Sequence, residues 1–416
     1  KNEINQAIVS IDNLNVKDIQ KLAIRIKPSN FKNYLLNNID KGTVEKILID
    51  VKLGENMKIN DYKVNGFVKK VNIKAPNDLL IKDISLNFIS DKNLTLINSL
   101  KAKYQGVLVS NGSLSLKRNK QVDIEGKFDS KFNLNKDTLK NLFSKTDVNF
   151  LEKNSLNAQG SLLHNFYLKF DENIKLIDYD YKSSGNISES QIILKDDFKS
   201  NFIENSIKKI LISQTNLTIN LNKKNNNLLL FEGLYNLEKT KNKKFKISYN
   251  LNKKNPKFLI DFDLAENINL ELINFKSNHK NRSNIKSEIN LVNNFIIFNY
   301  IKFTEGKNLI AVDNLKLKDS GELASISNIE VKTLNNNEEN NSFKISFKKK
   351  IVIIGSKYDA TFLLKQFSGD SETKLLENYT KDVEIKLNSL ITKSQIPLKN
   401  FNLIGKINKG KFEHLS

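Results

Sequence analysis

Apolar and polar residues alternate along most of this 416-residue chain. The clearest run is FKISYN, where Phe245, Ile247 and Tyr249 are separated by Lys246 and Ser248. Successive side chains of a strand point to opposite faces, so this period predicts strands with one apolar and one polar face, as in antiparallel sheets. Asn- and Lys-rich clusters separate the runs and predict hairpin turns. The sequence therefore predicts a mainly β protein without the strand–helix–strand rhythm of a parallel fold.

Alternation does not say what covers the apolar face. By itself it favours closed sandwiches or barrels. The unequal strand lengths and the lack of a clear linker point instead to one long, curved antiparallel sheet whose apolar face is an open groove, and the pattern alone leaves both arrangements open. We expect one continuous body over residues 1–416, with sub-units at 1–160, 161–355 and 356–416 as an alternative division. The groove-facing candidates are Leu217, Ile219, Leu221, Phe245, Ile247, Tyr249, Leu251, Phe258, Ile260, Phe262, Leu264, Phe343, Ile345 and Phe347.

A few short amphipathic helices interrupt the alternation. We expect helices over 27–42, where Gly42 is the stop signal before a strand that starts at Thr43, and over 135–145, where Asp137 is the cap. A weaker helical pattern covers 196–210.

The stretch IIGSKYDATFLLKQFSG, residues 353–369, combines the two-residue period of a strand with the spacing of apolar residues typical of a helix. Its first part predicts a strand that ends near Gly355. Asp359 then has the position of an N-cap and Gly369 that of a stop, around an apolar helix face made by Ala360, Leu363, Leu364 and Phe367. Such a helix either packs on the sheet at a boundary between groove units or is a plain crossover that closes a sandwich.

Composition limits the range of functions. The net charge is +21, but only three of the 67 basic residues are arginines, and the lysines are spread along the whole chain. Arginine is the usual residue for bidentate recognition of phosphate and guanine, so nucleic acid is not an expected partner. Lysine as a solvated face explains the charge, and a diffuse attraction to anionic lipid surfaces is the functional alternative. The absence of cysteine excludes disulfides and thiol chemistry.

No catalytic constellation is visible in the sequence. His164, His279 and His414 lie far apart in polar surroundings, and we interpret them as solvated histidines. There is no phosphate-binding loop, nucleophile elbow or metal-ligand spacing. We therefore expect a protein that is not an enzyme and uses no cofactor or metal.

The stretch after Ile353 resembles a strand–glycine–helix element of the AsmA-like envelope proteins of Gram-negative bacteria, the TamB and YhdP group. FKNYLLNNIDKGTVEKILIDVKL, residues 31–53, is similar to an element of the YhdP-like branch, and GFVKKVNIKA and FEGLYNL are similar to its strands. The order of these elements carries the resemblance over most of the chain. The matching positions of the first element are Gly355, Tyr358, Asp359, Ala360, Leu363 and Leu364.

This resemblance implies an elongated, taco-like antiparallel sheet of repeated β-groove units. In that family such units are expected to bind phospholipid acyl chains and to move lipid between the inner and outer membrane. It implies a periplasmic location and an inner-membrane anchor helix. The first residue is Lys1, so we expect a fragment of a longer chain, with the anchor outside it. Lipid and the membranes at the two ends are the expected partners, and lysines along the open edge would meet headgroup phosphates. The alternative function is a structural or adhesive array of β-sandwiches at a cell surface.

Overall fold

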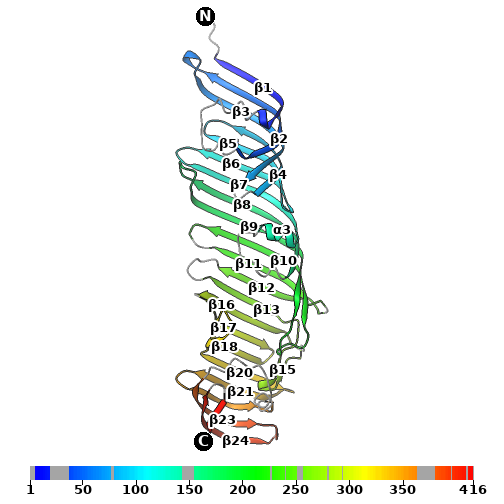
Figure 1. Cartoon of the computed structure of the whole chain (residues 1–416), viewed down its shortest axis with the longest axis vertical. Helices are drawn as coiled ribbons and strands as arrows, with labels where there is room; N and C mark the ends of the chain where they lie inside the picture. The colour runs from blue at the N-terminus through cyan, green and yellow to red at the C-terminus, as the bar shows by residue number, and fades with distance from the viewer. Residues whose placement is uncertain are drawn as a thin grey trace. The chain divides into compact units, whose positions relative to one another are not determined.

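The protein is mainly β, with a mostly antiparallel, open sheet and few helices, as the alternation predicts. The computed structural model describes residues 5–18, 37–75, 79–142, 154–224, 227–238, 240–250, 256–278, 281–292, 294–362, 380–394, 396–408 and 411–415. The chain forms two compact units, unit 1 with residues 1–192 and 213–228 and unit 2 with residues 193–212 and 229–416. Within each unit the strands lie side by side (Figure 1). The expected sub-unit boundaries at 160 and 355 both fall inside strands.

Unit 1 begins as a meander in which strands β1 to β8 pair antiparallel in chain order. The chain enters it at β1 and leaves it along β9, and β9 and β10 contribute residues to both units. Its elements are β1 (Gln6–Asn15), β2 (Ile39–Leu53), η1 (Glu55–Met57), β3 (Ile59–Ala75), β4 (Leu79–Ser90), β5 (Leu94–Tyr104), β6 (Val107–Arg118), β7 (Val122–Leu134), α3 (Lys136–Leu142), β8 (Ser155–Phe170), β9 (Leu176–Phe198) and β10 (Ile207–Asn222).

Unit 2 continues the antiparallel pattern with one exception at β22 and β23. Its elements are β11 (Leu228–Asn236), β12 (Lys243–Asn250), β13 (Lys257–Asp263), β14 (Asn269–Leu270), η3 (Glu271–Ile273), β15 (Phe275–Lys276), β16 (Ser283–Val292), β17 (Phe295–Glu305), β18 (Asn308–Lys318), β19 (Leu323–Ser325), β20 (Asn328–Asn335), β21 (Glu338–Phe347), β22 (Ile351–Asp359), β23 (Lys381–Ile391), β24 (Pro397–Asn408) and β25 (Lys411–Leu415).

The pair β22–β23 is parallel, from Ile351 opposite Val383 to Asp359 opposite Ile391. Parallel neighbours need a crossover of a dozen or more residues rather than a hairpin. The chain supplies it with residues 360–380, so the break in alternation after Asp359 is the start of a crossover. The predicted helix with Leu363 and Leu364 lies mostly outside the described residues.

The prediction that a strand ends near Gly355 is wrong, because β22 runs on through Tyr358 to Asp359. A Cβ at position 355 would lie 2.3 Å from the carbonyl oxygen of Ser342 and 2.5 Å from Cβ of Phe343. The glycine therefore permits a close approach of β21 inside the sheet, next to a bulge. At the end of β22, Oδ1 of Asp359 accepts hydrogen bonds from N and Oγ1 of Thr361, and the helix that Asp359 is expected to cap lies mostly outside the described residues.

The other helix predictions have mixed outcomes. The helix at 135–145 is confirmed as α3, but Asn135 rather than Asp137 is its cap, because Thr138 N donates to Asn135 Oδ1 and Asn135 N donates to Thr138 Oγ1. The helix at 196–210 is wrong, since strands β9 and β10 occupy its two ends.

The N-terminal helix prediction falls mostly outside the described residues, which resume at 37. Residues 37 and 38 are helical, as predicted, but the predicted end at Gly42 is wrong. Strand β2 already begins at Ile39, and Gly42 lies inside it rather than ending a helix. Within the described part of the chain, no helix is long and apolar enough to cross a bilayer.

Candidate functional site

One face of the unit 2 sheet is apolar across ten strands. Residues directly opposite each other on paired strands point to the same face, so the pairings define rows that run across the sheet. One row joins Phe245, Phe262, Ile285, Phe303, Ile310, Val331, Phe343, Gly355, Leu387 and Phe401. The neighbouring row joins Ile247, Ile260, Ser287, Ile301, Val312, Ile329, Ile345, Ile353, Ile385 and Leu403. We call this surface the apolar face.

The apolar face is packed laterally within the sheet. Phe245 stacks on Phe262 at 5.7 Å between ring centroids, and Tyr249 stacks on Phe258 at 4.0 Å. Val331, Phe343 and Leu387 are buried, whereas Ile247, Ile260 and Ile345 remain half-buried. Ser287, the polar member of the rows, donates its hydroxyl to the carbonyl of Tyr300. The face thus presents a nearly unbroken hydrocarbon surface with its polar groups satisfied.

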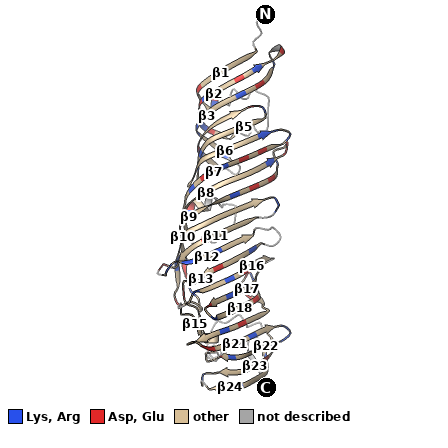
Figure 2. Ribbon diagram, turned by 180° about the vertical axis from the view of Figure 1, so that it is seen from behind, with Lys and Arg blue, Asp and Glu red and all other residues tan. Residues whose placement is uncertain are grey.

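The opposite face of the same strands is polar and carries ion pairs. Figure 2 marks the basic and acidic positions along the strands. Lys286 pairs with Asp261 at 3.0 Å, and Lys344 pairs with Glu330 at 3.2 Å. Lys350 and Lys386 flank the carboxylate of Glu384 and hold its pKa at about 2. The clear division between the two faces identifies the polar one as the solvated side of the sheet.

Nine of the fourteen groove-facing candidates share the apolar face of unit 2. The pairings and the alternation along each strand place them there: Phe245, Ile247, Tyr249, Phe258, Ile260, Phe262, Phe343, Ile345 and Phe347. Leu264 follows β13, and its amide donates to the carbonyl of Ser283. Leu217, Ile219 and Leu221 share one face of β10 and belong to unit 1. Leu251 lies outside the described residues.

A loop between β13 and β16 covers one end of the apolar face. We call residues 264–278 the strap. Ile273 of the strap packs against the cluster around Val331 and Phe343, and Phe275 meets Phe303 edge-on. The strap forms a second layer over this end of the face, and Ile351 and Val383 at the other end are also buried, at 5% and 2% exposure.

Polar residues at the ends of β20, β21 and β22 fasten the strap. Asn341, which is fully buried, donates to the carbonyl of Ile273 at 2.6 Å, and its Oδ1 accepts the amide of Asp359 at 2.8 Å. Asn274 donates to Asp359 Oδ2 at 2.8 Å, and the Tyr358 hydroxyl donates to the carbonyl of Leu272. Burial raises the pKa of that hydroxyl. The strap is therefore a fixed part of the fold.

Unit 1 has its own apolar surface. A row across its eight strands joins Ile11, Ile47, Gly66, Phe88, Ile97, Leu114, Gly126 and Phe166. Beside it lies a cavity of about 350 Å³ whose lining is wholly apolar. Its lining residues come from β4 to β8: Ile81, Ile84, Leu100, Ala102, Tyr104, Val109, Leu114, Phe128 and Phe166. A cavity of this kind suits a hydrocarbon ligand.

His164 is not solvated, which corrects the interpretation from the sequence. It is 7% exposed, forms hydrogen bonds of 2.7 Å with Ser130 and with the Tyr181 hydroxyl, and stacks on Phe128. Burial lowers the pKa of its imidazole. The sequence alone could have indicated this burial. On an alternating strand His164 points to the same face as Leu162, Phe166 and Leu168. His279 lies outside the described residues, as does the side-chain environment of His414.

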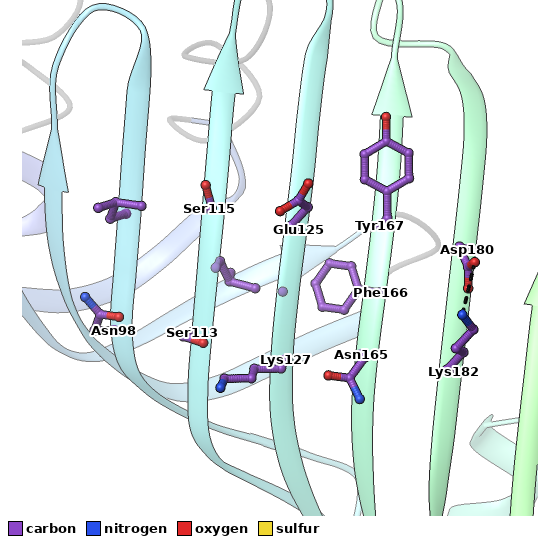
Figure 3. A pocket seen from close by; sticks show the side chains of 13 residues that line it. Asn98, Ser113, Ser115, Glu125, Lys127, Asn165, Phe166, Tyr167, Asp180 and Lys182 are labelled. Atoms are coloured by element: carbon purple, nitrogen blue, oxygen red, sulfur yellow. Dashed lines mark ion pairs between the residues drawn. The ribbon is translucent and has the colours of Figure 1, made fainter.

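A larger hollow of about 730 Å³ lies on the polar face of unit 1 (Figure 3). Its lining includes Glu125, Lys127, Asn165 and the ion pair between Asp180 and Lys182 at 3.5 Å. Tyr167 at its rim donates to Asp123, which raises the pKa of the phenol to about 12. Nothing in this set pairs a nucleophile with a base, so it offers less specific chemistry than the apolar surfaces.

No family model matches the chain, and comparisons with curated proteins and with solved structures find no similar protein.

Proposed function

We propose that this chain is a segment of a periplasmic, bridge-like lipid-transfer protein. In this proposal the apolar face binds the acyl chains of phospholipids and lets them pass between the inner and outer membrane. An anchor helix in the inner membrane is part of this proposal, as the resemblance implies. The resemblance to AsmA-like envelope proteins is the origin of this idea.

The observation that supports it best is the extent of the apolar face. Each methylene removed from water contributes about 0.8 kcal/mol, so an acyl chain gains from any part of a continuous hydrocarbon surface. The rows offer many equivalent half-buried positions, such as Ile247, Ile260 and Ile345, rather than one deep pocket. Equivalent weak sites suit a ligand that must move along the protein. An open apolar surface of this extent is also unusual for a protein without an apolar partner.

The test is lipid retention by matched variants of one strand. Ile260 and Leu259 are neighbours on β13 that point to opposite faces, and Leu259 is 40% exposed on the polar face. We expect phospholipid to co-purify with the parent chain from the periplasm, to be lost from Ile260→Asp, and to remain in Leu259→Asp. Native mass spectrometry with lipid extraction measures all three.

Two results would contradict the proposal. A folded parent chain without lipid, whose Ile260→Asp variant simply unfolds, would mean that the apolar face is a sealed core, as in a structural array of sandwiches. Equal lipid content in both variants would mean that the lipid is held elsewhere. Circular dichroism of each variant separates loss of binding from loss of fold.

A further inference from the structure

The chain contains two Asn-Gly pairs, Asn65–Gly66 on β3 and Asn111–Gly112 on β6. Asparagine reacts most readily when glycine follows it. The backbone nitrogen of the next residue can attack the carbon of the side-chain amide, and a glycine leaves that nitrogen uncovered because it has no Cβ. Whether the reaction occurs depends on how firmly the fold holds the two residues.

The fold holds Asn65 on both sides. It lies opposite Leu48 on β2 and Ile89 on β4, so its backbone is part of two antiparallel ladders. A Cβ at Gly66 would be 2.5 Å from a ring carbon of Phe88, so this ring covers the glycine. Attack on the side-chain amide needs rotation of the backbone, and the two ladders oppose that rotation. The first Asn-Gly pair is therefore protected by the fold.

Asn111 lies instead in a bulge. The pairing of β6 with β7 is regular up to Ser110 and resumes at Ser113, and only one residue of β7 lies opposite the two residues between them. The pairing of β6 with β5 also passes over Asn111. Its φ is 52° and it is exposed to solvent. Because the extra residue of a bulge is left out of the ladder, the backbone at Asn111 can rotate without breaking strand pairing.

We propose that Asn111 is a deamidation site, and that its conversion loosens the wall of the apolar cavity in unit 1. In the reaction the backbone nitrogen of Gly112 bonds to Cγ of Asn111, and the side-chain nitrogen leaves as ammonia with the amide proton of Gly112. Water then opens the cyclic imide, which leaves an aspartate or an isoaspartate at position 111. This inference is independent of the proposed function.

The product changes the surroundings of a charged neighbour. In the unmodified chain Nδ2 of Asn111 donates to Oδ2 of Asp129 at 2.7 Å. After the reaction two carboxylates lie at this position, so the donor is lost and like charges repel each other across the strands. Isoaspartate also adds one carbon to the backbone of β6, which shifts the residues that follow it.

This repulsion acts next to the cavity of unit 1. Asp129 lies between Phe128 and Ser130 on β7. Phe128 lines the cavity, and so does Val109, which lies opposite Ser130. Separation of β6 from β7 at the bulge therefore moves two residues of the cavity wall.

Peptide mapping of the folded and the unfolded chain tests the site. The parent chain is incubated at mildly alkaline pH, with and without urea, and mass spectrometry follows both asparagines. In the folded chain we expect Asn111 to convert about tenfold or more faster than Asn65, because only Asn65 must first leave two ladders by local unfolding. In urea we expect similar rates. Similar rates without urea, or an Asn111 that reacts only in urea, would overturn the assignment.

An exchange of side chains tests the consequence. Asn111→Asp reproduces one product, and in the double variant with Asp129→Asn the carboxylate and the amide change places. We expect Asn111→Asp to unfold at a lower urea concentration than the parent chain and to show faster hydrogen exchange in β6 and β7. The double variant should recover most of this loss, since it restores a donor and an acceptor. An unchanged Asn111→Asp, or a double variant without recovery, would overturn the proposed effect on the cavity wall.

Discussion

At the scale of single residues, His164 is notable because its side chain is ionisable but lies in apolar surroundings. An ionisable ring is placed on an apolar surface, and both ring nitrogens are engaged, one by Ser130 and one by Tyr181. Phe128, which stacks on the ring, also lines the apolar cavity of unit 1. The hydrogen bonds offset the cost of burying the neutral ring, but they do not offset the burial of a charge.

The folding stability of the chain should therefore depend on this histidine below neutral pH. Because burial lowers the pKa of His164, the folded state binds the proton less readily than the unfolded state, whose pKa is near the ordinary 6.5. Its contribution is fully present above pH 6.5 and is lost as the pH falls below that value. The loss is at most about 1.4 kcal/mol for each pH unit.

Urea unfolding of the parent and of His164→Gln, near pH 7.5 and pH 5.5, checks this. The variant keeps a hydrogen-bonding side chain but cannot titrate, so we expect it to lose less stability over this interval. The same pH dependence in both proteins would show that other groups are responsible.

The face on which a side chain lies could be predicted where apolar and polar residues alternate strictly. Phe245, Ile247 and Tyr249 were placed on one face because each neighbour is polar, and β12 pairs in that register. The role of His164 was missed because its partners are 34 and 17 residues away in the sequence. Only the register of three strands brings Ser130, His164 and Tyr181 together.

At the scale of elements, the strap shows how a loop can close an open sheet. The loop belongs to the connection between β13 and β16, yet it is fastened to strands about 70 to 85 residues further along the chain. Asn341 donates to the carbonyl of Ile273 in the strap, and it is held in place by hydrogen bonds to Thr333 on β20 and Asp359 on β22. An asparagine can do this because its amide both donates and accepts.

Removal of this side chain should release the strap. In Asn341→Ala the half-buried carbonyl of Ile273 and the buried amide of Asp359 lose their partners, and the unsatisfied amide of Asp359 alone costs about 1–3 kcal/mol. We expect limited proteolysis to cut within 264–278 in this variant but not in the parent chain.

The control is Ser346→Ala on the same strand, which removes one half-buried hydrogen bond to Asn328 far from the strap. Equal protection in Asn341→Ala and the parent chain would contradict the role of Asn341 as a fastener.

Strands that are joined by short hairpin turns could be predicted from the sequence. The longer connections that leave the sheet, such as the strap and the crossover before β23, could not. A glycine signals either a stop or a close approach, and the sequence alone does not distinguish the two. Gly42 and Gly355 both lie inside strands, where a Cβ would meet Val71 or Ser342 of the neighbouring strand. The parallel pairing of β22 and β23 depends on which edge the chain returns to, and local periodicity carries no information about that choice.

At the scale of the whole molecule, charge and apolar surface act over different ranges. The net charge of +21 attracts the chain to any anionic surface, without regard to acyl chains. This attraction is screened by salt, whereas hydrocarbon contact is not.

The two contributions should separate in a salt titration. We expect the chain to co-sediment with phosphatidylglycerol vesicles at low ionic strength and to be released near ~0.5 M NaCl, where the Debye length is only a few Å. Lipid already bound to the chain should stay bound under the same conditions. Release of both together would indicate that the lipid is held by charge alone. Phosphatidylcholine vesicles, which carry no net charge, serve as the control.

The parallel pair also sets an order for folding. Hairpins such as β21–β22 and β23–β24 close over short turns, so they can form early and independently of one another. Strands β22 and β23 can pair only after the connection 360–380 has placed the start of β23 beside the start of β22. We expect this seam to form late and to open first. It is also the place where two chains could most easily exchange their last strands.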